Sequence, residues 1–380
     1  MRVLVVGAGV IGASIAWELC RRGASVALLE SVSEGGQTSI ASAGMVNPFS
    51  LTPTENPALP FMLHSLRLYP EWAAQLHEEV GIDIEWCCGG SLRVALHESD
   101  AQHLRTTYEW VRRYEPEAKW LSVHEARELE PALTEGCSAA LWLPSEGWVH
   151  TERLMRALHT AARQAGVEFH RGQPVVGFLQ ERGRVVGVRT ASGILHGDVV
   201  VVAAGAWTGA LMHTLGLHLP IEPVRGQILV LADLPRPVRH IITSLTSLIG
   251  YLVPRANGTA LLGATREHAG FDLRATADGL HQLLQILLRL FPALAGATIG
   301  GHMVGLRPGT PDANPLIGSI EGFEGLYLAS GHAYHGILLA PATAQAVADL
   351  VLNGATELPI TPFDPARFLQ LPTATPTAGV

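Results

Sequence analysis

Three glycines near the start of the chain constrain its fold more than any other feature. Gly7, Gly9 and Gly12 have the spacing G-x-G-x-x-G and follow a short apolar run at residues 2–6, which predicts a buried strand. In this pattern the first glycine permits a tight turn, the second lets the backbone approach a pyrophosphate, and the third lets a helix pack closely on the strand. The N-terminus of that helix then faces the phosphates.

The residues after the glycines complete a β-α-β unit. Ile11, Ile15 and Leu19 recur every four residues and predict a helix, and the segment ASVALLE that follows predicts a second strand. This strand ends at Glu30, whose carboxylate can accept hydrogen bonds from a ribose diol. The unit predicts that a dinucleotide binds here, but it does not distinguish NAD from FAD.

Composition excludes several classes of protein. A length of 380 residues suffices for two joined domains, and 48% hydrophobic with 16% charged residues is typical of a globular chain. The net charge of -8 is spread out with no Lys/Arg block, so we expect no nucleic-acid partner. The most apolar helical segment, residues 280–291, contains polar residues and is too short to span a bilayer. We see no signal peptide, and we predict a cytoplasmic protein without an integral membrane segment, possibly a homo-oligomer.

Cysteine and histidine patterns do not indicate a metal site or a disulfide framework. The four cysteines are Cys20, Cys87, Cys88 and Cys137. Two of them are adjacent, which fits neither a C-x-x-C knuckle nor a secreted disulfide scaffold, so we interpret them as free thiols. His332 and His335 lie three residues apart, but no H-E-x-x-H motif accompanies them, and we predict no metal.

The remaining pattern alternates helices and strands. Helices are predicted at residues 64–81, within 99–132, at 151–166 and at 276–291, and strands at 89–96, within 167–211 and within 221–264. Ser122, with Glu125 three residues later, predicts a capping box at the start of the second helix within 99–132. Residues 324–354 read as a strand, a glycine turn and a helix. Residues 33–45 are rich in Ser, Ala and Gly, at the point where an NAD domain would continue with another β-α unit. These small residues would let the backbone pass close to a large flat ligand. We find no repeat and no linker, which predicts interleaved domains.

Several separated motifs resemble one known family. They are VVGAGVIGASIAWEL (5–19), GGQTSIASAGM (35–45), VVVAAGAWTG (200–209), YLVPR (251–255), LLGAT (261–265), GLRPGTPDANPLIG (305–318) and GLYLASGHAYHGILLAPATAQAVADLV (325–351). In this order they resemble the D-amino acid oxidase superfamily of FAD-dependent oxidoreductases, and most of all its glycine oxidase branch. The resemblance covers nearly the whole chain and implies that the nucleotide is FAD.

The resemblance also implies an α/β fold with two interleaved domains. One is a Rossmann-like FAD-binding domain of the glutathione reductase type, and the other is an α+β substrate domain built on an antiparallel sheet. We assign residues 1–84, 146–220 and 305–365 to the FAD-binding domain and residues 85–145 and 221–304 to the substrate domain. Residues 366–380 are interpreted as a flexible tail.

The implied reaction is the oxidative deamination of a small amino acid or amine, such as glycine, sarcosine or a D-amino acid. Hydride passes from Cα to flavin N5, and O2 reoxidises the flavin to give H2O2. No cysteine follows Cys137, so the C-terminal cysteine that carries covalent flavin in sarcosine oxidase relatives is missing, and we expect non-covalent FAD. Four alternatives stay open: an amino acid dehydrogenase with another electron acceptor, an oxidase or demethylase for a bulkier N-substituted amino acid, an NAD-dependent dehydrogenase, and a flavin-bearing subunit with an inactive pocket.

Two side chains are predicted to hold the substrate. Arg307, in GLRPGTP, corresponds to the carboxylate-binding arginine of the family, and a guanidinium can bind a carboxylate through two hydrogen bonds. From its sequence context alone Arg307 could equally be a surface arginine in a salt bridge. Tyr251 corresponds to a substrate-side tyrosine, although its ring could simply pack in the sheet. No general base stands out, and hydride transfer from a neutral amine requires none.

The sequence departs from the family pattern near the predicted pocket. Glycine oxidases carry an arginine in the turn GH-x-R-N-G, where this chain has Tyr334 followed by His335. Arg266 stands where a smaller or apolar residue is usual, and Ile249 stands where some relatives have a polar group. We count Tyr334, His335 and Arg266 with Arg307 and Tyr251 as catalytic candidates. Arg266 could bind a carboxylate or could point to solvent, and Tyr334 and His335 could suit a bulkier or N-substituted amino acid.

The cofactor-binding candidates come from the matched motifs and from the turn that enters the last helix, whose backbone N–H groups would face the flavin. They are Gly7, Gly9, Val10, Ile11, Gly12, Glu30, Ser31, Thr38, Ser39, Ala43, Gly44, Met45, Val175, Ala204, Gly205, Trp207, Arg307, Gly331, His332, Ala333, Tyr334, His335, Gly336, Ile337 and Leu338.

Overall fold

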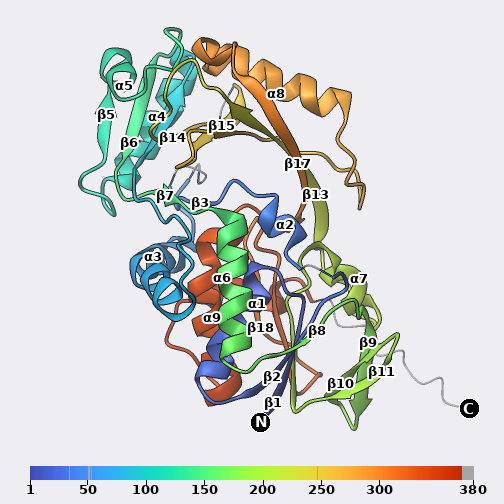
Figure 1. Cartoon of the computed structure of the whole chain (residues 1–380). Helices are drawn as coiled ribbons and strands as arrows, with labels where there is room; N and C mark the ends of the chain where they lie inside the picture. The colour runs from blue at the N-terminus through green and yellow to red at the C-terminus, as the bar shows by residue number, and fades with distance from the viewer. Residues whose placement is uncertain (34, 50–51, 53, 246, 370–380) are drawn as a thin grey trace, which may run out of the picture.

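Two large β-sheets, one above the other in Figure 1, organise the molecule. The structure is a computed structural model that describes residues 1–33, 35–49, 52, 54–245 and 247–369. Helices and short connections join the sheets, and the chain passes from one sheet to the other several times.

The lower sheet has the strand order β18-β19-β12-β1-β2-β8. Its strands are β1 (Arg2–Val6), β2 (Ser25–Leu29), β8 (Glu168–His170), β12 (Val199–Val202), β18 (Leu316–Ser319) and β19 (Leu326–Ser330). All neighbours are parallel except β18 and β19, and Val3 in the central strand pairs with Val26 on one side and Val199 on the other. The continuous apolar runs of these strands follow from burial on both faces.

Helices cover one face of this sheet and a small sheet covers the other (Figure 1). The helices are α1 (Val10–Arg21), α3 (Leu59–Val80), α6 (Thr151–Gln164) and α9 (Gly336–Asn353). The opposite face packs against α7 (Thr208–His213) and the antiparallel strands β9 (Val175–Glu181), β10 (Arg184–Thr190) and β11 (Gly193–His196). The two strands of the β-α-β unit predicted at the start of the chain therefore lie in this sheet, and its helix α1 lies in the layer that covers one face.

The upper sheet has the order β17-β13-β16-β15-β14-β4-β6-β5. Its strands are β4 (Ser91–Ala95), β5 (Lys119–Leu121), β6 (Ala139–Leu143), β13 (Glu222–Ala232), β14 (Ile241–Leu245), β15 (Ile249–Pro254), β16 (Ala260–Gly263) and β17 (Thr298–Gly309). It is antiparallel except between β14 and β4. The apolar side of α8 (Ala277–Leu290) packs on it. The fold class predicted from the sequence is confirmed, with one mainly parallel and one mainly antiparallel sheet.

Shorter elements fill the connections. They are α2 (Gln37–Ile40), β3 (Met45–Val46), α4 (Glu98–Val111), α5 (Val123–Leu129), β7 (Gly147–Trp148) and the 3-10 helices Gly205–Trp207, Pro292–Leu294, Thr361–Phe363 and Pro365–Arg367. Helix α5 begins with a capping box, in which Ser122 Oγ accepts from the N–H of Glu125 and the Glu125 carboxylate accepts from the N–H of Ser122.

The predicted domain limits remain a prediction, but two segments are placed. The last part of β17 pairs with β13 as far as Gly309 opposite Glu222, so residues 305–309 lie in the upper sheet. Arg367, within the predicted tail, donates from Nη2 to the carbonyl oxygens of Asn314 and Pro315 at 2.9 Å each. Residues 370–380 of that tail lie outside the described residues.

Helix α9 has a proline, Pro341, in its second turn. Pro341 has no N–H to give to the carbonyl of Ile337, and the hydroxyl of Tyr69 donates to that oxygen instead. Ser65 Oγ donates to the next carbonyl, that of Leu338, at 2.6 Å. Helix α3 therefore holds the start of α9 in place. Within the described residues, α9 is the one helix long and apolar enough to cross a membrane, and most of it is buried in the protein.

Candidate active site

A cavity of about 580 Å3 lies between the two sheets. Its floor is the edge of the lower sheet where β1, β2, β12 and β19 end and where α1 and α9 begin. Its roof is one face of β13, β15 and β17. Ligands of open α/β sheets bind at the carboxyl ends of the strands, so this is the expected place for a dinucleotide.

Tight backbone packing shapes the end of the cavity at α1. Gly7 has φ +103°, and a Cβ there would lie 2.5 Å from the carbonyl oxygen of Ala203. A Cβ on Gly12 would lie 1.8 Å from the carbonyl oxygen of Gly7, so only glycine lets α1 start this close to β1. Gly12 does not itself line the cavity, whereas Gly7 and Gly9 do. The side chain of Ser39 accepts from the N–H of Val10 at 3.0 Å and fixes the neighbouring segment to the helix start.

Glu30 closes the same turn from the end of β2. Its Oε2 accepts from the N–H of Ala8 at 2.9 Å, and its Oε1 accepts from the N–H of Val32 at 3.2 Å. The carboxylate is thus held at the cavity wall, with acceptor capacity left for a diol. His159 supports the turn from α6, because its Nε2 lies 2.8 Å from the carbonyl oxygen of Ala8. Burial lowers the pKa of His159. Sequence reasoning missed His159, since nothing in its helical pattern relates it to the glycines.

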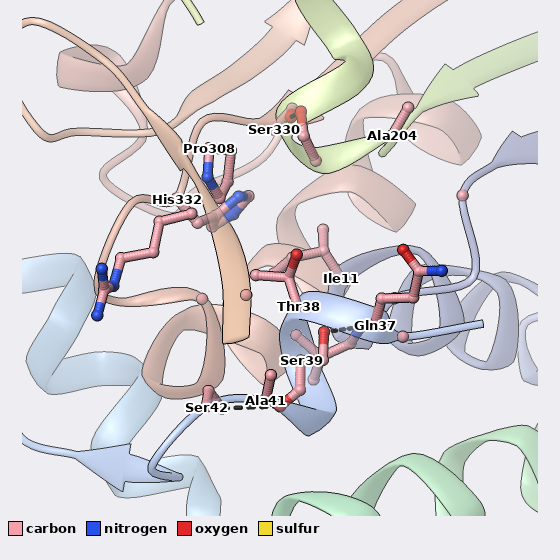
Figure 2. Close-up of a pocket in the computed structure, with 18 of the residues that line it drawn as sticks. Ile11, Gln37, Thr38, Ser39, Ala41, Ser42, Ala204, Pro308, Ser330 and His332 are labelled. Atoms are coloured by element: carbon pink, nitrogen blue, oxygen red, sulfur yellow. Dashed lines mark hydrogen bonds between the residues drawn. The ribbon is translucent and has the colours of Figure 1, made fainter. Parts of the chain in front are cut away.

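The segment after Gly36 forms one side of the cavity. Figure 2 shows Thr38, Ser39, Ala41 and Ser42 on this side and Pro308, Ser330 and His332 across from them. The hydroxyl of Thr38 donates to the carbonyl of Leu306 in β17 at 2.9 Å, which ties this side to the roof. The small side chains expected from the sequence therefore let backbone pass close to the space that a flat ligand needs.

Alternating residues of the roof strands face the cavity. Gly305 and Arg307 of β17 do so, as do Gly226 and Ile228 of β13. A Cβ on Gly226 would lie 2.2 Å from Nη1 of Arg307, so the guanidinium lies directly over this glycine. Nη1 donates to the carbonyl of Thr265 at 3.1 Å. The structure therefore places Arg307 inside the cavity instead of in a surface salt bridge.

Replacing Gly226 with alanine should displace the guanidinium of Arg307, because the added methyl group needs the space that Nη1 and Nη2 occupy. We expect the KM for the substrate to rise about fivefold to fiftyfold, as expected for a weakened hydrogen bond to a charged group. Steady-state kinetics with equal flavin loading checks this. Gly300→Ala, whose Cβ would meet its nearest neighbour at 3.4 Å in the same sheet, is the control. An unchanged KM in Gly226→Ala would contradict the placement.

Tyr251 lies beside Arg307. A Cβ on Gly263 would lie 2.3 Å from Cζ of Tyr251, so a glycine again makes room for the side chain. Burial raises the pKa of Tyr251, and the charge of Arg307 only partly opposes this shift. The phenol is therefore neutral at neutral pH and can donate a hydrogen bond into the cavity.

The turn between β19 and α9 brings backbone to the side of the cavity that lies across from the segment after Gly36 (Figure 2). Ala333 has φ +45° and donates its N–H to the carbonyl of Pro308 at 3.1 Å. Gly336 and Ile337, the first residues of α9, line the cavity, whereas His335 is turned into the protein. The first N–H groups of a helix have no intrahelical partner, and they carry the positive end of its dipole.

His332 and His335 are both buried, and His332 alone lines the cavity. Burial lowers the pKa of His332 to about 3, with a smaller contribution from the neighbouring His335, and lowers the pKa of His335 to about 4. Nε2 of His332 lies 3.1 Å from the hydroxyl of Thr343. Both rings are neutral at physiological pH. No group of three or more His, Cys, Asp or Glu side chains that could hold a metal ion occurs in the part of the chain that the structure describes.

Acid should destabilise the protein through these two histidines. In the unfolded chain each binds a proton near pH 6.5, but in the folded protein only near pH 3 to 4, so the unfolded state binds more protons between these values. The free energy of unfolding should fall as the pH decreases below about 6.5, by up to roughly 1.4 kcal/mol per pH unit for each histidine. Thermal melts between pH 7 and 4.5 test this. The pair His332→Asn and His335→Asn should flatten the slope, whereas His124→Asn on the surface should not.

Most predicted residues line this cavity. Those are Gly7, Gly9, Val10, Ile11, Glu30, Ser31, Thr38, Ser39, Ala43, Gly44, Met45, Val175, Ala204, Gly205, Trp207, Tyr251, Arg266, Arg307, His332, Ala333, Tyr334, Gly336 and Ile337. Gly12, Gly331, His335 and Leu338 lie behind its wall. Residues that line it without having been predicted include Gly36, Gln37, Ala41, Ser42, Gly226, Ile228, Pro308 and Ser330.

Comparison with known proteins settles the family. Residues 2–350 match the family described as FAD dependent oxidoreductase. The chain belongs to this family. It is 36% identical over 371 residues to a glycine oxidase of Pseudomonas putida, and the match covers 97% of each chain.

Solved structures of this family agree with the fold. The crystal structure of glycine oxidase from Geobacillus kaustophilus superposes with a TM-score of 0.91 at 34% identity, covering 98% of this chain and 100% of the other. The iminodiacetate oxidase of Chelativorans sp. BNC1 superposes with a TM-score of 0.88 at 26% identity, covering 96% and 99%. The predicted resemblance is confirmed, and the chain is an FAD-dependent oxidoreductase.

The cavity fits FAD. Its volume is in the usual range for cofactor sites, one end has the glycine cradle with the start of α1, and the other lies beneath the roof strands. All four cysteines are free thiols, and none of them is among the described residues that line the cavity.

Proposed function

We propose that the chain oxidises a small amino acid or amine, such as glycine, sarcosine or a D-amino acid, with non-covalently bound FAD. The observation that carries this proposal is the guanidinium of Arg307 on the cavity side of the roof, with the hydroxyl of Tyr251 beside it. A fixed cation and a neutral donor in a mostly apolar pocket suit a carboxylate.

Arg307 binds the substrate carboxylate and orients the α-carbon toward the floor of the cavity, while Tyr251 donates a further hydrogen bond. When bound, FAD supplies the chemistry by accepting a hydride from the α-carbon. The N–H groups of Gly336 and Ile337 at the start of α9 favour negative charge at this side of the cavity. His332 stays neutral, so it adds no competing positive charge.

No lining side chain needs to act as a strong base in this reaction. When the amine arrives neutral, loss of hydride from the α-carbon leaves an iminium group, and this group becomes an imine by losing one N–H proton, which water can accept. The lining of the cavity is mostly apolar, as is usual for a small-molecule site.

The electron acceptor, the cellular location and the oligomeric state belong to the same proposal. We expect O2 to be the electron acceptor, giving H2O2, in a cytoplasmic enzyme that can form a homo-oligomer. The alternatives are a dehydrogenase with another acceptor and an oxidase for an N-substituted amino acid. The likeness to an iminodiacetate oxidase supports the second alternative, because iminodiacetate is an N-substituted glycine.

An anaerobic panel of amino acids and N-substituted amino acids tests the proposal. We expect at least one member to bleach the flavin absorbance of the purified holoenzyme, and peroxide to accumulate when the same substrate is added in air. Bleaching without peroxide in air would indicate a dehydrogenase. If no member reduces the flavin, the proposed function is wrong.

A further inference from the structure

A second guanidinium faces the cavity beside that of Arg307. After β16 the chain continues to pair with β13, since the N–H groups of Arg225 and Glu267 donate to each other's carbonyl oxygens at 2.9 and 3.0 Å. Strand alternation turns Thr265 and Glu267 to the far side of the sheet, where they bond Gln227. Arg266 lies between them and therefore points into the cavity, which it lines.

The charges of these two arginines are not neutralised by the protein. Glu267, next to Arg266 in sequence, accepts from Arg225 at 2.6 Å, and Asp272 also pairs with Arg225. Among the residues that the structure describes, neither Arg266 nor Arg307 has a carboxylate within ion-pair distance. Arg307 donates a hydrogen bond to the carbonyl of Thr265, which is neutral. The roof of the cavity therefore has two positive charges to offer a ligand.

The ring of Tyr334 lies near both guanidinium groups. The Cζ atom of Arg266 lies 4.4 Å from the centre of the Tyr334 ring, and that of Arg307 lies 5.4 Å from it. The two charges are thus no farther apart than the sum of these distances, a span that a short dicarboxylate can bridge. Contact with a ring uses the face of a guanidinium, which leaves its N–H groups free to bond carboxylates in the plane.

We propose that the preferred substrate carries two carboxylates: an amino acid with a second carboxylate on its side chain or on its nitrogen. Arg307 binds the carboxylate next to the reacting carbon, and Arg266 binds the second one. The inference rests on the proposed function and narrows its substrate class. An amino acid with one carboxylate would pair with Arg307 and leave the exposed Arg266 to solvent, whereas a dicarboxylate pairs with both arginines.

Two matched substrate pairs test this inference on the holoenzyme. D-aspartate is compared with D-alanine, and iminodiacetate with sarcosine, because the members of each pair differ by a carboxylate. For at least one pair, kcat/KM from anaerobic flavin reduction should be at least tenfold higher for the dicarboxylate. The pair that shows the preference tells whether the second carboxylate sits on the side chain or on the nitrogen.

The variant Arg266→Met should lower the ratio of kcat/KM for the dicarboxylate to kcat/KM for its partner compound about tenfold. This effect is modest for a charged hydrogen bond because the side chain of Arg266 is exposed. Arg266→Lys, which keeps the charge, should retain most of the ratio. Arg274→Met removes an exposed arginine from the same connection outside the cavity lining and should leave the ratio unchanged. In the wild type, malonate should perturb the flavin spectrum at about tenfold lower concentration than acetate.

The outcomes separate the two proposals. Reduction by D-alanine or sarcosine with equal or weaker reduction by the dicarboxylates overturns the inference and leaves the proposed function standing. A ratio that stays the same in Arg266→Met also overturns it. If none of the four compounds nor any other amino acid reduces the flavin, the proposed function fails and the inference fails with it.

Discussion

Arg307→Ala should raise the KM for the amino acid substrate about tenfold to a hundredfold while the protein still binds FAD. The guanidinium faces the cavity from β17, and the carboxylate would lose a charged hydrogen bond worth about 1.5–3 kcal/mol. Tyr251 remains beside the vacated position and cannot replace the charge. Steady-state kinetics with the best substrate of the panel, together with the flavin content of the purified protein, measures both parts of the result.

Arg274→Ala is the control for this experiment. It removes a positive charge from the connection between β16 and α8, outside the cavity lining. It should keep the wild-type KM. An unchanged KM in Arg307→Ala would remove this arginine from the substrate site. Loss of flavin together with loss of activity would instead show that Arg307 holds the cofactor.

Gly12→Ala should deprive the protein of its cofactor. In an ordinary helix this substitution favours folding by up to about 1 kcal/mol, so helix propensity predicts the opposite effect. Here the new methyl group would lie 1.8 Å from the carbonyl oxygen of Gly7, and neither backbone can move without opening the turn between β1 and α1. We expect the flavin content of the purified protein to fall more than tenfold and the melting temperature to drop by several degrees, as overpacking costs typically 1–3 kcal/mol.

Gly136→Ala provides the matched comparison, because its Cβ would meet its nearest neighbour at an ordinary 3.6 Å. It should bind FAD like the wild type. Circular dichroism distinguishes a folded protein that lacks flavin from an unfolded one. A yellow Gly12→Ala variant with full flavin content would show that the start of α1 tolerates more space than the structure allows.

Features that depend on neighbouring residues were accessible from the sequence. The strand before the glycines, the helix after them and the capping box at Ser122 all occur where the pattern predicts. Their signals are local: a hydrophobic period, a glycine spacing, and a side chain that reaches three residues along the chain. The prediction that Arg307 binds the substrate depends on the family motif, because an arginine before Pro-Gly has several possible environments.

Features that depend on distant strands were not accessible. Gly226 reads as a weak position in a strand, and its role appears only when β17 lies beside β13 and brings Arg307 over it. His335 was expected in the pocket with Tyr334, yet the turn into α9 directs the two side chains differently. The carbonyl oxygens near Pro341 in α9 accept hydrogen bonds from Ser65 and Tyr69 of α3, a long-range contact that the local pattern does not indicate. One sequence does not show such compensation between elements.

The strand order has a consequence for how the protein is made. The central strand β1 leaves the ribosome well before its neighbour β12, which begins at Val199, and before β19 and α9, which begin at Leu326 and Gly336. The early strands therefore stay unpaired until the later segments have been synthesised. Such long-range pairing favours slow folding, and the exposed apolar strands need protection from aggregation in the meantime. Because the first turn of α9 forms part of the cavity wall, the flavin can be fully enclosed only after α9 has been synthesised.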